Sequence, residues 1–202
     1  ESKMNFIANK LTPATEVAGD VIVHRNVMIA MRDGIHLATD IYRPAVDGVP
    51  GETALPVILE RTPYNKAGTP RTELSLKNPV SMSRPELAIH LVRKGYIVIW
   101  QDCRGRYDSE GHFTKYPSEG EDGYDTMVWV EAQPWNNSRI GTMRLSYDAH
   151  TQMALACLNP PGLSAMAVDS GGFSNAFTCG IRQGGAFELK QATWAYHRAQ
   201  EG

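Results

Sequence analysis

The order of apolar segments in the second half of the chain most limits its fold. Residues 96–100 (Tyr-Ile-Val-Ile-Trp) are continuously apolar, as in a strand covered on both faces. The preceding segment 85–94 has helical spacing and ends at Gly95, where a C-cap glycine belongs. The same alternation continues with a helix at 122–133, a short strand at 140–145, a helix at 147–158, a buried strand at 165–168 and an amphipathic helix at 187–200. This alternation predicts an α/β domain with a largely parallel sheet.

The first half predicts antiparallel strands that join this sheet. Residues 21–31 are β-branched and apolar, Arg32-Asp33-Gly34 is a hairpin-type turn, and 35–42 alternates apolar with polar residues. A Gly/Pro loop at 46–55 and a short apolar run at 56–60 follow, whereas residues 1–20 give a weak signal. We therefore expect antiparallel N-terminal strands, with helices on both faces of the sheet.

Composition excludes several classes of protein. The 202 residues are 42% apolar and 21% charged, with a net charge of −2, so no basic field favours nucleic acid or an anionic membrane surface. No apolar run reaches the roughly 18 residues of a membrane span. The cysteines (Cys103, Cys157 and Cys179) form no CxxC pair, and Cys157 and Cys179 are expected to be buried and structural. Without an apolar signal segment at its start, the chain is expected to be a soluble bacterial protein of the cytoplasm or periplasm.

Ser146 is the candidate nucleophile. It falls between a short predicted strand and a predicted helix, which is the setting of a nucleophile elbow. Serine is also a favoured helix N-cap, and the local context alone favours that simpler interpretation. Glycine motifs for dinucleotides or phosphates and an HExxH zinc motif are absent, and nothing near Cys103 predicts a reactive thiol.

Six motifs in sequence order favour the nucleophile interpretation of Ser146 over the N-cap interpretation. They are residues 61–66 (RTPYNK), 101–105 (QDCRG), 109–113 (SEGHF), 119–125 (EGEDGYD), 129–135 (WVEAQPW) and 145–147 (LSY). Together they resemble the catalytic domain of the cocaine esterase and X-prolyl dipeptidyl-peptidase family of serine hydrolases, over roughly residues 20 to 200. The resemblance implies an incomplete α/β-hydrolase fold: a lead-in at 1–20, the first part of the catalytic domain at 21–172, and the start of a helical cap at 173–202.

The resemblance also implies roles for three residues. Ser146 matches the nucleophile that forms the acyl-enzyme, and the backbone N–H of Tyr147 matches one oxyanion donor. The hydroxyl of Tyr64 matches the second donor, although an ordinary rim tyrosine is the alternative. The implied substrate is a small ester, an amide or a short peptide, with no cofactor, no metal and no nucleic-acid or membrane partner; self-association is left open. Asp102 is expected to be an ion-pair or turn residue near Arg104 and Arg106.

The elbow departs from the family pattern. Arg144 stands where the family has glycine two residues before the serine, and Asp148 occupies the later glycine position of a general G-x-S-x-G turn. A side chain at 144 must leave the packed turn or distort it. An ion pair of Arg144 with Asp148, four residues away, would not restore the space. Asn137-Ser138 stands where the family has Asn-Gly, in a turn that favours positive φ.

The catalytic triad is incomplete in this sequence. The family places the Asp and His well downstream of the serine, and none of the six histidines lies at that position. His150 is expected to pack against its own helix, and His197 to be solvated. The sequence therefore resembles the first part of a larger hydrolase that is inactive alone. The alternative is a catalytically inactive family member that acts as a binding or scaffold protein.

Overall fold

One mixed β-sheet organises the chain in the computed structural model, which describes residues 14–70, 82–171, 182–183, 186–187 and 189–199. The strands of this sheet are β1 (Ala14–Ala18), β2 (Val21–Ala30), β3 (His36–Val46), β4 (Val49–Pro50), β5 (Leu55–Thr62), β6 (Ile97–Asp102), β7 (Asn136–Leu145) and β8 (Leu163–Asp169). Their order is β1-β2-β3-β6-β5-β7-β8, with β4 paired to β3. The pairings from β1 to β6 are antiparallel and those joining β6, β5, β7 and β8 are parallel, which confirms the predicted fold class.

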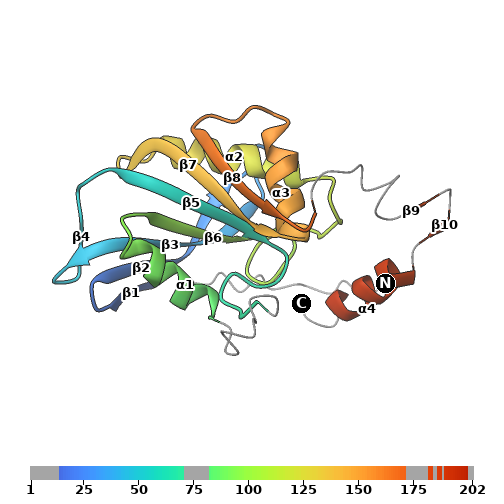
Figure 1. The fold of residues 1–202 in the computed structure, drawn as a ribbon, viewed down its shortest axis with the longest axis horizontal. Coiled ribbons are helices and arrows are strands. Elements are labelled where there is room, and N and C mark those ends of the chain that lie inside the picture. Colours follow the sequence, from blue (N-terminus) through green and yellow to red (C-terminus); the bar gives the residue numbers. More distant parts are fainter. Residues whose placement is uncertain (1–13, 71–81, 172–181, 184–185, 188, 200–202) are drawn as a thin grey trace, which may run out of the picture.

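Helices cover both faces of the sheet (Figure 1). Helix α1 (Arg84–Val92) packs on one face through Ala88 and Val92 against Val98 and Trp100 of β6. Helices α2 (Glu119–Glu131) and α3 (Tyr147–Ala156) pack on the other face. Their residues Met127, Val130 and Leu155 form a core with the strand residues Val57, Leu59, Ile97, Ile99 and Ile140. Burial of these apolar side chains on both faces explains why β6 reads as a continuous apolar run.

Helix α4 (Leu189–Ala199) and the short hairpin of β9 (Arg182–Gln183) and β10 (Ala186–Phe187) complete the described elements. The α4 segment corresponds to the helix predicted at 187–200. The predicted domain boundary at 172/173 falls at residues outside those described and stays a prediction.

Local signals set the ends of several elements correctly. Ser83 and Glu86 form a reciprocal capping box at the start of α1, and Gly95 after this helix has φ +93, which suits glycine. Strand β3 extends past the predicted end at residue 42 because Arg43 and Pro44 continue the ladder with β2. Strand β1 was not predicted, because its residues are largely exposed and carry no clear alternation.

Two burial predictions were wrong. Strand β8, predicted as buried, alternates between partly buried and exposed residues, since it pairs only with β7 and is the last strand of the described sheet. Cys157, predicted as a buried structural residue, is exposed at the C-terminal end of α3. Cys103 is buried as expected of a small apolar side chain, whereas Cys179 lies outside the described residues.

Candidate active site

Ser146 lies in the sharp turn between β7 and α3. Its φ of 60° and ψ of −122° are unusual for a residue other than glycine. The backbone N–H of Ser146 donates to the carbonyl oxygen of Asp169 at 3.1 Å, which ties the turn to the end of β8. Ser146 occupies the N-cap position of α3, but its side chain makes no capping hydrogen bond to the helix. Strained conformations of this kind gather at functional sites, where the surrounding fold holds them.

Gly171 leaves room for this turn. A Cβ atom at position 171 would lie 2.8 Å from the carbonyl oxygen of Ser146 and 3.3 Å from its Cα. Glycine therefore lets the chain leaving β8 approach the backbone of the candidate nucleophile.

Arg144 also has a positive φ, of 134°. Its side chain leaves the turn and its Nε atom lies 2.7 Å from Oε2 of Glu60, with only 7% of the side chain exposed. Arg84 holds the other oxygen of Glu60 at 2.6 Å and reaches Asp148 at 3.3 Å. Arg144 and Asp148 therefore belong to one buried cluster of two arginines and two acids, in which Arg144 contacts Glu60 and Asp148 contacts Arg84. Burial and the adjacent Glu60 raise the pKa of Asp148 well above its usual value.

The first residues of β7, where the sequence predicts a turn before the strand, also include a positive φ. Ser138, in the position where the family favours glycine, has φ 61°. The amide of Ser138 donates to the side chain of Asn136 at 3.1 Å, which supports the turn locally.

Tyr64 reaches the site from the loop after β5. Its hydroxyl accepts a hydrogen bond from Nε1 of Trp194 at 3.2 Å, and it also interacts with the side chain of Ser146. Burial raises the pKa of Tyr64 to about 12, although these two hydrogen bonds act in the opposite direction. The phenol is therefore protonated at neutral pH and able to donate a hydrogen bond.

Tyr147 is the first residue of α3, and its backbone N–H has no acceptor four residues earlier within the helix. The side chain turns away from solvent, because its hydroxyl donates to Oε1 of Glu119 at 2.8 Å and accepts from the N–H of Tyr116 at 3.0 Å. Burial, and then the charge of Glu119, raise the pKa of Tyr147. Tyr147 thus fixes the start of the helix while its amide stays beside Ser146.

A cavity of about 430 Å³ opens beside Ser146 and Tyr64. Its walls come from the loop after β5, the elbow, and α4; they include Tyr64, Asn65, Gly68, Thr69, Pro70, Arg84, Tyr107, Arg144, Leu145, Ser146, Asp148, Trp194 and Arg198. The structure therefore brings Ser146 and Tyr64 to one cavity. No local sequence pattern predicted that Trp194 reaches this site, because it lies 130 residues from Tyr64 in the chain.

Asp102 and its neighbours form the scaffold of the site. Asp102 is an ion-pair residue as expected, but its partner is the buried Lys66 at 2.9 Å, not Arg104 or Arg106. Arg104 instead holds Asp33 and Asp122, at 2.7 Å and 2.6 Å.

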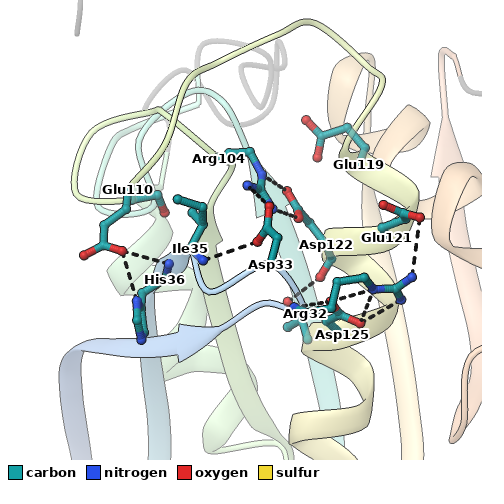
Figure 2. A network of polar contacts seen from close by, with 12 residues as sticks. Arg32, Asp33, Ile35, His36, Arg104, Glu110, Glu119, Glu121, Asp122 and Asp125 are labelled. Carbon is teal, nitrogen blue, oxygen red and sulfur yellow. Dashed lines mark hydrogen bonds and ion pairs between the residues drawn. The ribbon is translucent and has the colours of Figure 1, made fainter.

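A polar network joins the loop after β6 to the β2–β3 turn and to α2 (Figure 2). The side chain of Glu110 accepts from the backbone N–H of His36 at 2.9 Å, and Arg32 pairs with Asp125 of α2 at 2.8 Å. These contacts link segments more than 70 residues apart in sequence and fix the loop that leads toward Phe113 and Tyr116.

Neither His150 nor His197 is placed as a general base. The ring of His150 packs on that of Tyr116 with 4.1 Å between centroids, and burial, followed by the charge of Lys115, lowers its pKa. His197 is exposed on α4. Among the described residues, no histidine ring is hydrogen-bonded to the side chain of Ser146; His150 contacts Ser146 through its backbone N–H, which donates to the carbonyl oxygen of Ser146 at 3.3 Å. In the same part of the chain, no cluster of three or more His, Cys, Asp or Glu side chains is arranged to hold a metal ion. The described helices include none with the length and apolarity of a membrane span.

The strand order and the strand–turn–helix unit that carries Ser146 define an α/β-hydrolase fold. The sequence profile of the X-Pro dipeptidyl-peptidase (S15) family matches residues 33–202, and the chain belongs to this family. It is 36% identical over 151 residues to cocaine esterase from Rhodococcus sp. (strain MB1 Bresler), covering 75% of this chain and 24% of that protein. A putative serine esterase from Mycobacterium tuberculosis is 30% identical over 152 residues, with 69% and 23% covered. The chain thus spans about a quarter of these relatives.

Solved structures agree with this assignment. An α-amino acid ester hydrolase is 31% identical with a TM-score of 0.57, over 82% of this chain and 28% of that one. A CocE/NonD family hydrolase from Staphylococcus aureus has a TM-score of 0.75 over 96% of this chain and 37% of that one. At 23% identity, the second likeness concerns the fold alone.

Proposed function

We propose that this chain supplies the nucleophile and the oxyanion site of a serine hydrolase that cleaves an ester, amide or peptide bond. The observation that carries the proposal is the strained elbow conformation of Ser146 at the wall of a cavity that Tyr64 also lines. The names of the relatives support this reaction class, since they include an esterase, an α-amino acid ester hydrolase and an aminopeptidase.

In the proposed reaction, Oγ of Ser146 attacks the substrate carbonyl and the leaving group departs with a proton, which leaves an acyl-enzyme. Water then attacks the acyl carbon and releases the acid. The negative charge on the carbonyl oxygen is stabilised by the N–H of Tyr147 and the O–H of Tyr64, a protonated phenol in a largely buried setting. The general base and the acid that orients it are proposed to come from residues outside the described part of the chain.

The proposal is tested by covalent labelling of the natural gene product. A fluorophosphonate should react at Ser146, identified by peptide mass spectrometry, and hydrolysis of activated esters should be lost in Ser146→Ala. Ser164→Ala is the matched control, because Ser164 is an exposed serine on β8 and should leave both readouts unchanged. Full ester hydrolysis by the Ser146→Ala protein would refute the assignment of the nucleophile.

A second candidate is a catalytically inactive binding protein. The observation that favours it is Arg144, whose φ of 134° puts a large residue where the elbow favours glycine. Labelling separates the two candidates, because an inactive elbow leaves Ser146 unmodified under conditions that label an active serine hydrolase.

A further inference from the structure

Trp194 contacts the proposed oxyanion donor directly. Its Nε1 atom lies 3.2 Å from the hydroxyl oxygen of Tyr64, and the two rings meet edge to face with 6.4 Å between centroids. The indole is itself held in place, because it stacks parallel to the ring of Tyr147, with 5.9 Å between centroids and 2° between planes. Phe113 packs against it from the loop after β6, at 6.1 Å.

The chemistry of the two groups gives this contact a direction. An indole N–H can only donate, whereas a phenol oxygen can accept and donate. Because Tyr64 accepts from Trp194, the hydrogen of its own hydroxyl points away from the indole. Tyr64 and Ser146 line the same cavity, so this hydrogen is available to a substrate carbonyl oxygen bound at Ser146. An accepted hydrogen bond also makes the phenol a better donor, because hydrogen bonds in a chain polarise one another.

We propose that Trp194 is a positioning residue: its indole N–H directs the hydroxyl of Tyr64 toward the substrate carbonyl oxygen, which becomes negative when Ser146 attacks. This inference rests on the proposed oxyanion role of Tyr64 and extends it to a residue of α4. Trp194 acts through Tyr64, so its loss weakens stabilisation of the transition state more than binding of the substrate.

Arg106 holds the two partners at this distance. Its Nε donates to the carbonyl oxygen of Pro63 at 3.1 Å, and its Nη1 donates to the carbonyl oxygen of Arg198 at 3.0 Å. Pro63 immediately precedes Tyr64, and Arg198 lies one helical turn after Trp194. The Arg106 side chain is buried, with the residue 5% exposed, so this bridge ties the loop after β5 to α4. The position of the helix is thereby coupled to the orientation of the phenol.

The test replaces the indole N–H with as little other change as the side chain allows. In the natural gene product, Trp194 is exchanged for 3-benzothienylalanine, in which sulfur replaces N–H while ring size and stacking are retained. With an activated ester, kcat is expected to fall about tenfold and KM to change less than about twofold, since a misaligned oxyanion donor costs less than a missing one. Tyr64→Phe is expected to lower kcat about 100-fold. The same analogue at Trp129, which is remote from Tyr64, is the matched control.

A double-mutant cycle separates positioning from a general structural role. In the Tyr64→Phe background the analogue at Trp194 should cause no further loss, because the hydroxyl that it orients is gone. An unchanged kcat for the Trp194 analogue, or a full tenfold loss in the Tyr64→Phe background, would overturn the inference. If Tyr64→Phe has no effect, the proposed oxyanion role of Tyr64 fails as a separate result, and the inference fails with it.

A second readout does not depend on turnover. With 3-fluorotyrosine incorporated, the ¹⁹F resonance of Tyr64 is assigned by its absence in Tyr64→Phe. The pH midpoint of the titration of this resonance should move to a higher value when position 194 carries the benzothienyl ring. The reason is that the hydrogen bond from the indole N–H lowers the pKa of Tyr64. A midpoint that stays the same would show that the hydrogen bond does not form, and would overturn the inference even for a protein without measurable turnover.

Discussion

Replacing Arg144 with glycine tests the energetics of the elbow most directly. Arg144 combines an unfavourable backbone conformation, φ 134°, with a buried ion pair to Glu60 at 2.7 Å. Arg144→Ala removes the ion pair and keeps a Cβ in the positive-φ conformation, whereas Arg144→Gly removes both. The difference in stability between the two variants therefore measures the backbone strain less the entropic cost of glycine.

The expected magnitudes follow from these contacts. Loss of a buried hydrogen bond between charged groups costs about 1.5–3 kcal/mol, and Glu60 keeps its contact with Arg84 in both variants. Strain at an unfavourable φ costs about 1–3 kcal/mol, and the greater chain entropy of glycine in the unfolded state offsets about 0.5–1 kcal/mol of its relief. Arg144→Ala should thus be about 2 kcal/mol less stable than the native protein, and Arg144→Gly should regain about 1 kcal/mol of that loss.

Urea unfolding followed by tryptophan fluorescence measures these differences as shifts of the midpoint at constant slope. The order of stability should be native, then Arg144→Gly, then Arg144→Ala. If Arg144→Ala is as stable as Arg144→Gly, the backbone strain at position 144 is no larger than the entropic cost of glycine, about 0.5–1 kcal/mol, and the reasoning is refuted. If Arg144→Ala equals the native protein, the pair with Glu60 contributes nothing to stability.

Three further predictions concern the packing around the site. Gly123→Ala should destabilise the protein by about 1–3 kcal/mol despite the higher helix propensity of alanine, because the new Cβ would lie 2.7 Å from the Cβ of Leu155; equal or higher thermal stability would contradict the tight helix contact. Burial lowers the pKa of His150 below 6.5, so the unfolded chain binds its proton first, and stability should fall as the pH drops below about 6.5 through the lowered value. His150→Phe should lack that component of the pH dependence in urea titrations, and an unchanged profile would refute it. Ellman's reagent should modify Cys157 in the native protein but Cys103 only after unfolding, since Cys103 is buried and burial raises the pKa of its thiol; peptide mass spectrometry distinguishes the two sites.

The outline of the fold could be predicted because it depends on local patterns. The apolar run of β6, the helical spacing of α1 and the glycine after it each reflect one element and its immediate burial. Burial at the sheet edge was predicted poorly for the opposite reason. Whether β8 is covered depends on which elements pack beside it. Its own residues Ala165, Ala167 and Val168 are apolar and do not indicate whether such an element is present.

The site divides in the same way. Residue order alone predicted that Ser146 lies between a strand and a helix, because this follows from the local pattern at one turn, and the family resemblance marked Arg144 as a large residue in that turn. Which charges pair, and which side chain contacts Tyr64, became known from the tertiary structure. Glu60 reaches Arg144 across 84 residues and Trp194 reaches Tyr64 across 130. Such pairs depend on strand order and helix docking, which bring together side chains that no local sequence pattern connects.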